Sequence, residues 1–148
     1  MSDVLFYHLE FQPLERVLPV LLEKTIERGW RAVVEVGSNE RAAALDTALW
    51  TYRDDSFLAH GLAGEETDPE QPVLITTGHE NGNGAAVRFF VDRAVPQSAE
   101  GYERIVYLFS GHDPDAVTEA RAAWRLLREG NEVTYWQQDE NGRWAKKA

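Results

Sequence analysis

The sequence contains no cysteine, and this absence excludes several kinds of chemistry. There can be no disulfide bond, no thiol nucleophile and no cysteine-ligated zinc. Long apolar runs are also missing, because no stretch approaches the ~20 consecutive apolar residues that a membrane-spanning helix needs. No basic region followed by an apolar stretch opens the sequence, so we expect no signal peptide. These features favour a cytoplasmic protein.

Basic residues are scarce as well. The chain has 15 Lys and Arg against 25 Asp and Glu, which gives a formal net charge of −10. Phosphate contacts need clustered Lys and Arg, so this balance disfavours general binding to nucleic acid. An acidic protein can still carry one basic patch, so the positions of the basic residues matter. With 148 residues, 43% of them hydrophobic, the chain is expected to form one domain over residues 1–148.

Apolar periodicity predicts alternating strands and helices. Strands are expected at Val4–His8, Arg31–Val36, Val73–Thr77, Ala86–Asp92, Arg104–Phe109 and Glu132–Gln137. Helices are expected from Leu14 to the stop at Gly29, over Glu40–Leu49 and over Asp115–Glu129. The strand–helix–strand–helix opening favours parallel pairing. We therefore predict a single α/β domain with a mostly parallel open sheet flanked by helices, which is a Rossmann-like arrangement. The polar segment 139–148 is a candidate for a mobile tail.

Such a fold invites a search for a nucleotide site. The turn at 37–40 has one glycine and matches neither G-x-G-x-x-G nor G-x-x-x-x-G-K-[ST]. Glu40 at the start of the following helix would repel phosphate. The Gly82-Asn83-Gly84 stretch is interpreted as a hairpin turn between two strands. We therefore expect no nucleotide and no other cofactor.

Catalytic and metal-binding patterns are weak. Ser110, His112 and Asp113 are neighbours on one turn, whereas the members of a catalytic triad come from separate elements and converge in space. Asp113 is better interpreted as the N-cap of the next helix, with Pro114 in its first turn. The four histidines show no paired metal-ligand spacing, so neither a metal nor a catalytic residue is expected.

The helix at 115–129 is the most informative element. At 100° per residue, one arc faces the sheet and consists of Ala116, Ala120, Ala123 and Leu127. A second arc is basic and consists of Arg121, Arg125 and Arg128, with Trp124 beside it. The basic arc is either a solvated face that neutralises nearby carboxylates or part of a pocket for an acidic peptide. In such a pocket the Trp supplies apolar contact and an Arg takes a carboxylate.

A second informative stretch spans residues 45–65. Trp50 ends a helix, and Phe57 follows seven residues later on a loop flanked by aspartates. Both aromatic side chains could fill the core, as large aromatics usually do. Alternatively, together with Leu49 and Leu58, they form an apolar patch that another protein covers. His60 is expected to hydrogen-bond within its own loop.

The same stretch resembles the chi subunit family of the bacterial DNA polymerase III holoenzyme, whose members are clamp-loader accessory proteins. The residues that carry the resemblance are Leu45-Asp46, Ala48-Leu49-Trp50, Ser56-Phe57, His60 and Leu62-Ala63-Gly64-Glu65. The order of the predicted elements also fits, so the resemblance covers nearly the whole chain. It implies a non-catalytic adaptor of the replicative clamp loader.

In that family the helix corresponding to 115–129 is said to receive the acidic C-terminal tail of single-stranded-DNA-binding protein, which ends in Pro-Phe. The resemblance assigns this role to Arg121, Trp124 and Arg125, with Phe109 and Ser110 as the nearby wall. Arg128 belongs to the same basic arc. The Ser110-Gly111 pair is smaller and more polar than the apolar-Pro pair expected there. The terminal carboxylate would pair with Arg125 while the Phe ring packs on Trp124.

The resemblance implies a second partner, the small psi subunit, which ties chi to the clamp loader. Trp50 and Phe57 would be the anchors of that contact, with Leu49 and Leu58 beside them, and the same face could instead serve a helicase-like partner. DNA would be contacted only indirectly, and the protein would be cytoplasmic and nucleoid-associated through the replisome. Two alternatives remain at this point. One is a Rossmann-like enzyme or small-molecule-binding domain, and the other is direct nucleic-acid binding through the basic arc and tail.

Overall fold

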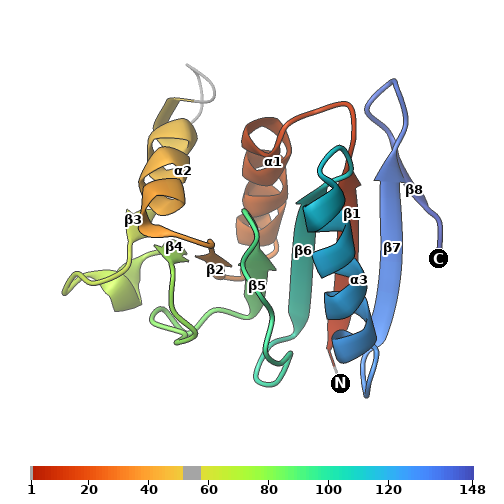
Figure 1. Cartoon of the computed structure of the whole chain (residues 1–148). Coiled ribbons are helices and arrows are strands. Elements are labelled where there is room, and N and C mark those ends of the chain that lie inside the picture. The colour runs from red at the N-terminus through yellow and green to blue at the C-terminus, as the bar shows by residue number, and fades with distance from the viewer. Residues whose placement is uncertain (1, 52–57) are drawn as a thin grey trace.

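The computed structural model describes residues 2–51 and 58–148 (Figure 1). The helices are α1 (Leu14–Glu27), α2 (Asn39–Thr51) and α3 (Pro114–Leu127), with the short 3-10 helix η1 (Asp68–Glu70). The strands are β1 (Asp3–Leu9), β2 (Ala32–Glu35), β3 (Gly61–Leu62), β4 (Val73–Thr76), β5 (Val87–Phe90), β6 (Arg104–Ser110), β7 (Glu132–Gln138) and β8 (Trp144–Lys146). The three predicted helices and six predicted strands are all present, with ends shifted by a few residues.

The described strands form one open sheet in the order β3-β4-β2-β5-β6-β1-β7-β8. Every neighbouring pair is parallel except β7 and β8, which are antiparallel. The prediction of a mostly parallel α/β sheet with a Rossmann-like arrangement is therefore confirmed. In the described part of the chain, no helix is both long and apolar enough to cross a membrane.

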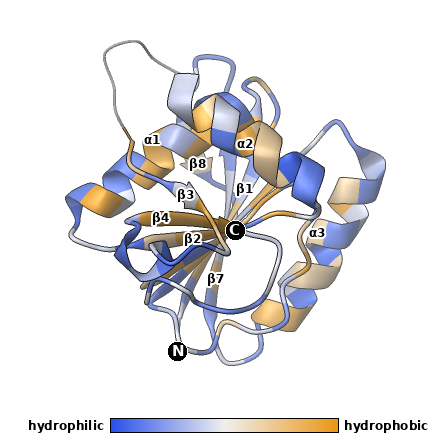
Figure 2. Ribbon diagram, turned by 90° about the vertical axis from the view of Figure 1, so that its left-hand side faces the viewer, coloured by the Kyte–Doolittle hydropathy of each residue, from blue (hydrophilic) through white to orange (hydrophobic). Residues whose placement is uncertain are grey.

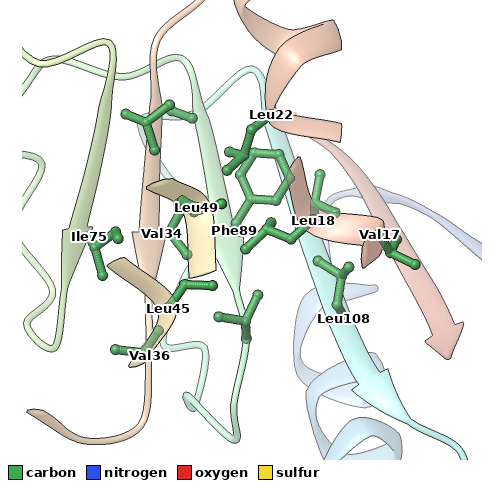
Figure 3. Close-up of a cluster of buried hydrophobic side chains, with 14 of the residues drawn as sticks. Val17, Leu18, Leu22, Val34, Val36, Leu45, Leu49, Ile75, Phe89 and Leu108 are labelled. Atoms are coloured by element: carbon green, nitrogen blue, oxygen red, sulfur yellow. The ribbon is translucent and has the colours of Figure 1, made fainter. Parts of the chain in front are cut away.

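Helices cover the two faces of the sheet unequally (Figure 2). One face packs against α1 and α2, whose buried leucines meet Val34 and Phe89 of the central strands (Figure 3). The other face packs against α3, whose small Ala120 and Ala123 allow the helix close to Phe6 of β1. Burial of these side chains supplies the main stabilisation of the fold. Because α3 is the one helix on this face within the described residues, it has room on its flanks for side chains that form a cleft.

Two sequence-based interpretations of local structure need correction. The Gly82–Gly84 stretch is not a hairpin turn, because β4 and β5 are each parallel to β2 and lie on either side of it. Residues 77–86 instead cross over β2, and the Asn83 amide donates to the carbonyl of Ala32 at 3.0 Å. In addition, strands β3 and β8 were not predicted, and β8 lies within the segment predicted as a polar tail.

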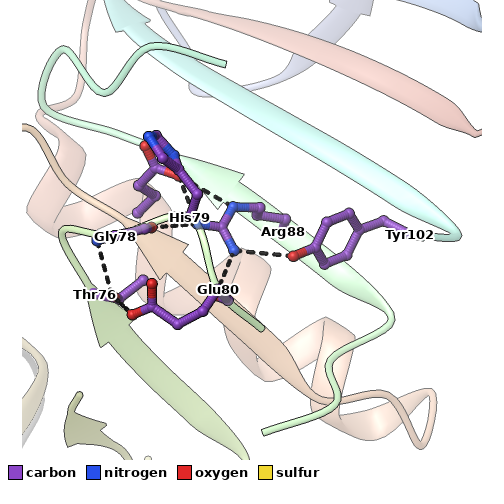
Figure 4. Close-up of polar contacts among 7 residues, drawn as sticks. Thr76, Gly78, His79, Glu80, Arg88 and Tyr102 are labelled. Carbon is purple, nitrogen blue, oxygen red and sulfur yellow. Dashed lines mark hydrogen bonds and ion pairs between the residues drawn. The ribbon is translucent and has the colours of Figure 1, made fainter. Parts of the chain in front are cut away.

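A buried ion pair fastens this crossing loop to the sheet. Nη2 of Arg88 lies 2.5 Å from Oε1 of Glu35, and both side chains are almost fully buried. The guanidinium also donates to the carbonyls of Gly78 at 2.6 Å and Glu80 at 3.1 Å, and to the hydroxyl of Tyr102 at 3.0 Å (Figure 4). Every one of these partners belongs to the chain itself. Arg88 is therefore a structural residue that joins β5, β2 and two loops.

Candidate functional site

A cleft of about 450 Å³ lies between α3 and the face of β1 and β7. It is lined by Phe6, His8, Phe109, Val117, Ala120, Arg121, Trp124, Arg125, Tyr135 and Ala148. We call it the α3 cleft. It brings together four of the residues predicted for a partner site, namely Phe109, Arg121, Trp124 and Arg125.

The floor of the α3 cleft is aromatic. Phe6 is almost fully buried, and its ring centroid lies 5.4 Å from that of Trp124 in an edge-to-face arrangement. Tyr135 meets both Trp124 and Phe109 at centroid distances of 6.3 Å. These contacts follow from the parallel pleat, because the register pairs Phe6 of β1 with Tyr135 of β7 and places both on one face. The result is an apolar surface that suits an aromatic or proline side chain.

The rim of the cleft is basic because of the geometry of α3. The buried alanines and Leu127 face the sheet, as the periodicity predicted. Trp124 is half-buried at the flank, whereas Arg121 and Arg125 are exposed one turn apart. Among the described residues, neither arginine forms a hydrogen bond or an ion pair through its guanidinium. Two cations therefore face solvent beside an apolar cleft in a protein of net charge −10.

His8 and Tyr135 keep the floor of the cleft uncharged at neutral pH. Nδ1 of His8 is hydrogen-bonded to the hydroxyl of Tyr135. Burial lowers the pKa of His8, and the nearby His112 lowers it further. The Glu10 carboxylate acts in the opposite direction but does not cancel the shift. Burial likewise raises the pKa of the Tyr135 hydroxyl. A neutral imidazole and a neutral phenol leave Arg121 and Arg125 as the charges that an incoming anion meets.

Two predicted residues lie elsewhere. Ser110 is exposed at the end of β6 and lines the neighbouring crevice, not the α3 cleft. Arg128 is the C-cap residue of α3 and does not line the cleft. Their predicted roles in partner binding would therefore be peripheral.

Six of the lining residues were not predicted for the site from the sequence, and three of these come from strands β1 and β7, namely Phe6, His8 and Tyr135. The available signal was the alternation in β1 and β7, which places every second side chain on one face. That signal does not say which strands are neighbours. The pairing of β1 with β7 joins residues more than 120 positions apart, so it becomes visible only in the folded sheet.

A second crevice of about 520 Å³ lies where the carboxyl ends of β1 and β6 meet. The chain leaves β1 toward α1 on one face and β6 toward α3 on the other, which is the point where α/β sheets usually bind ligands. Its lining is acidic and includes Glu10, Glu15, Asp92, Asp113 and Glu119. These carboxylates disfavour a phosphate.

The loop after β6 has the structural role predicted for it. Oδ1 of Asp113 accepts hydrogen bonds from the backbone N–H groups of Asp115 at 3.0 Å and Ala116 at 3.4 Å, as an N-cap does. Nε2 of His112 lies 2.7 Å from the carbonyl of Glu10, away from Ser110. The N-cap prediction is confirmed, and these side chains do not converge as a catalytic triad would.

The face predicted for a second partner is partly described. Trp50 is 48% exposed at the end of α2, and its ring lies 4.3 Å from that of buried His60. His60 contacts the carbonyl of Leu58 at 2.7 Å, as predicted for its own loop, and also Oδ1 of Asp46 in α2 at 3.1 Å. The second predicted anchor, Phe57, lies outside the described residues.

The two leucines predicted beside Trp50 are core residues. Leu49 and Leu58 are only 2% and 5% exposed, so they support this face from beneath instead of contributing contact surface. Leu49 points inward because it shares the buried arc of α2 with Leu45 and Ala42. Leu62 of the edge strand β3 is 37% exposed and was not predicted as part of the face.

Comparisons with known proteins identify the family to which this chain belongs. Residues 1–134 match the family model described as DNA polymerase III chi subunit, HolC. The chain is 28% identical over 109 residues to the DNA polymerase III subunit chi of Pseudomonas aeruginosa, covering 74% of this chain and 75% of that protein. It is 25% identical over 101 residues to the protein of the same name from Haemophilus influenzae, covering 68% and 69% of the two chains.

A third relative is the probable DNA polymerase III subunit chi of Rickettsia prowazekii, at 26% identity over 87 residues. That match covers 59% of this chain and 53% of the relative. The family match includes β1 to β6, all of α3 and the start of β7, and thus nearly the whole α3 cleft. The chain therefore belongs to the DNA polymerase III chi subunit family, an accessory and non-catalytic part of the polymerase.

Proposed function

We propose that this chi subunit binds the acidic C-terminal tail of single-stranded-DNA-binding protein in the α3 cleft. The observation that carries the proposal is the pair of exposed arginines, Arg121 and Arg125, without an ion pair among the described residues and beside an aromatic floor. An acidic peptide that ends in an aromatic residue complements both features. The tail would thereby connect the clamp loader to DNA coated with that protein.

Charge and packing contribute different parts of the recognition. The two arginines attract the acidic tail and raise its rate of association. A terminal carboxylate pairs with Arg125 by charge-assisted hydrogen bonds, for which the planar guanidinium is well suited. The terminal ring packs against Trp124 and reaches toward Phe6 and Tyr135 at the cleft floor. One tail is expected to bind weakly, and several tails on one assembly gain strength through effective concentration.

The test is a titration of the protein into a labelled peptide ending in Asp-Asp-Ile-Pro-Phe, followed by fluorescence anisotropy. We expect saturable binding that weakens with added salt, and Arg125→Ala to raise the Kd about tenfold or more. Arg16→Ala is the matched control, because Arg16 is exposed on α1 at the opposite face of the sheet. Equal losses in both variants, or no binding at millimolar protein, would contradict the proposal.

A second contact is supported by the exposed Trp50. The Trp50 indole is 48% exposed and packs on the ring of His60, so it is suited to anchor a partner protein. Leu62 on strand β3 is also exposed. We assign this surface to the psi subunit or to an equivalent protein that links chi to the clamp loader. Trp50→Ala should abolish co-purification with that partner and leave tail binding unchanged. Loss of tail binding in Trp50→Ala would contradict this separation of the two surfaces.

A further inference from the structure

A third cavity, a groove of about 490 Å³, lies between α1 and the strands β1, β7 and β8, on the sheet face opposite the α3 cleft. It is lined by Leu5, Tyr7, Leu21, Lys24, Thr25, Glu27, Arg28, Phe89, Arg104, Val106, Trp136 and Trp144. We call it the α1 groove. Trp136 follows Tyr135 in β7, and the pleat directs these two neighbours to opposite faces. The groove and the α3 cleft therefore share strands β1, β6 and β7 but no lining residue.

Three aromatic side chains from three strands form one wall of the α1 groove. The rings of Tyr7 and Trp136 are nearly parallel at 24°, with centroids 6.5 Å apart. Trp144 meets Tyr7 edge-on at 4.8 Å. All three are half-buried, so part of each ring faces the groove. The indole N–H of Trp136 donates to Oγ1 of Thr134 at 2.9 Å, which holds that ring in place.

Four cations lie on the same side of the sheet as these rings. Lys24 and Arg28 come from α1, and Arg104 comes from the start of β6. Lys146 is the register partner of Trp136 in the antiparallel pair, so both side chains lie on the same face. Among the described residues none of the four forms an ion pair.

Arg104 is the most unusual of these cations. Its Nε is buried without a hydrogen-bond partner among the described residues. Its guanidinium carbon lies 5.4 Å from the ring centroid of Trp30, and that of Arg28 lies 4.4 Å from the same ring. Both arginines are thus held against an indole at one end of the groove. The Trp30 ring holds both guanidinium groups in place, and no carboxylate among the described residues pairs with either of them.

Carboxylates are fewer around the groove. Glu27 lines it, and Asp3 and Glu132 begin the neighbouring strands on the same side of the sheet. Among the residues that line the groove, Lys24, Arg28 and Arg104 outnumber the single carboxylate of Glu27, so the lining is positively charged in a chain whose overall charge is −10. The charge of the α1 groove is therefore opposite in sign to that of the protein.

We propose that the α1 groove binds single-stranded nucleic acid without sequence preference. Exposed aromatic rings that stack with bases, flanked by cations that follow a phosphate backbone, are the two elements of such sites. A base would stack on Trp136, while Lys24, Arg28 and Lys146 contact successive phosphates. The inference goes beyond the tail contact and does not depend on it.

An acidic peptide is the competing occupant, and the arrangement favours nucleic acid. The cations come from three separate elements on the same side of the sheet as the rings, which suits an anion repeated along a chain. The rings form an open wall and not a single closed pocket for one terminal side chain. Because the surrounding protein is acidic, the contact is expected to be weak and strongly dependent on salt.

The test uses a labelled 15-mer of deoxythymidine and the full chain, followed by anisotropy at low and at physiological salt. Trp136→Leu should raise the Kd about tenfold, since one base–aromatic stack is lost. The double variant Lys24→Gln with Arg28→Gln should reduce the slope of log K against log salt by about 1.4, because each lost single-strand phosphate contact contributes about 0.7. Arg125→Ala, on the other face, should leave oligonucleotide binding unchanged.

Four results would overturn the proposal. The first is no binding of the 15-mer at low salt by a wild-type protein that melts cooperatively. The second is equal affinity for an abasic strand of the same length, which would exclude stacking. The third is a loss of oligonucleotide affinity in Arg125→Ala as large as the loss in the groove variants. The fourth is tighter binding of a poly(Glu, Tyr) peptide than of the 15-mer to the same groove. Trp136→Phe should restore most of the affinity lost in Trp136→Leu, and failure to do so would also count against the proposal.

Discussion

The guanidinium of Arg88 is buried and fully surrounded by partners, whereas those of Arg121 and Arg125 lie at the rim of the α3 cleft without an ion pair among the described residues. Arg88 donates to a carboxylate, two backbone carbonyls and a phenol, all from within the chain. The cleft arginines are exposed on a helix that contacts the sheet through alanines. The same residue type thus serves the fold in one region and remains available in the other.

This difference separates structural charge from functional charge. A buried cation requires its partners, because an unpaired buried charge is strongly destabilising. An exposed cation has no such requirement, and its removal seldom affects stability by more than about 0.5 kcal/mol. Substitutions in the two regions should therefore affect different measurements: the free energy of unfolding for Arg88, and the affinity for an acidic tail for Arg125.

The largest expected effect is on stability and comes from Arg88→Leu. This change removes the guanidinium from the buried Glu35 carboxylate and leaves only the exposed imidazole of His79 beside it, at 3.4 Å, so the free energy of unfolding should fall by about 3–5 kcal/mol. Urea denaturation with an unchanged m value measures it. Replacing both Glu35 and Arg88 by Leu is the matched control and should recover the part of the loss that comes from the unpaired carboxylate, while the carbonyls of Gly78 and Glu80 stay without their donor. A double variant as unstable as the single one would show that the charge pair is not the cause.

A smaller effect, on both measurements, is expected from Trp124→Ala. Its ring forms part of the cleft wall and packs on Phe6, so tail affinity should fall by about 2 kcal/mol, or roughly 30-fold. Stability should fall by about 2 kcal/mol, because the side chain is only half-buried. Anisotropy titration and urea denaturation on the same samples give the two values. Unchanged affinity would exclude the aromatic contact with the tail.

Arg128→Ala sharpens the comparison within one helix. Arg128 lies just beyond the last turn of α3 and does not line the cleft. Its removal should change the affinity for the tail by less than about 0.5 kcal/mol, and only at low salt, through weaker long-range attraction. A loss equal to that of Arg125→Ala would mean that net charge on the helix, and not position in the cleft, determines binding.

The smallest effect is a dependence of stability on pH from His8. Its folded pKa lies below the unfolded value of about 6.5, so the unfolded state binds the proton more readily. Stability from this group is fully present above that pH and falls as the pH is lowered through it. Urea denaturation at pH 7.5 and 5.5 should show a steeper loss for the wild type than for His8→Gln. Equal losses would show that His8 does not contribute.

The sequence predicted the parts of the site that depend on local periodicity. The arc of Arg121, Trp124 and Arg125 follows from 3.6 residues per turn and from the alanines that face the sheet. The N-cap at Asp113 is equally local, since a side chain and the N–H groups two and three residues later define it. These features need no knowledge of the rest of the fold.

The sequence could not predict the parts that depend on strand order. Phe6 and Tyr135 reach the cleft because β7 pairs with β1, which is decided by the packing of the whole sheet. The hairpin predicted at 82–84 was wrong for the same reason, because the sequence does not show that β2 lies between β4 and β5. The turn residues there belong to the connection that crosses β2. Strand β8 was missed because three residues carry little periodicity, and its pairing with β7 depends on contacts such as that of Trp144 with Tyr7.

The most direct test of the central claim is a double-mutant cycle between Arg125 and the carboxyl terminus of the tail. The Kd is measured for wild type and Arg125→Ala, each with a peptide ending in free Phe and with the same peptide amidated. Our account predicts a coupling of about 1–3 kcal/mol between the guanidinium and the terminal carboxylate, with the free energy of unfolding unchanged. A coupling near zero, with both peptides weakened equally by Arg125→Ala, would contradict it.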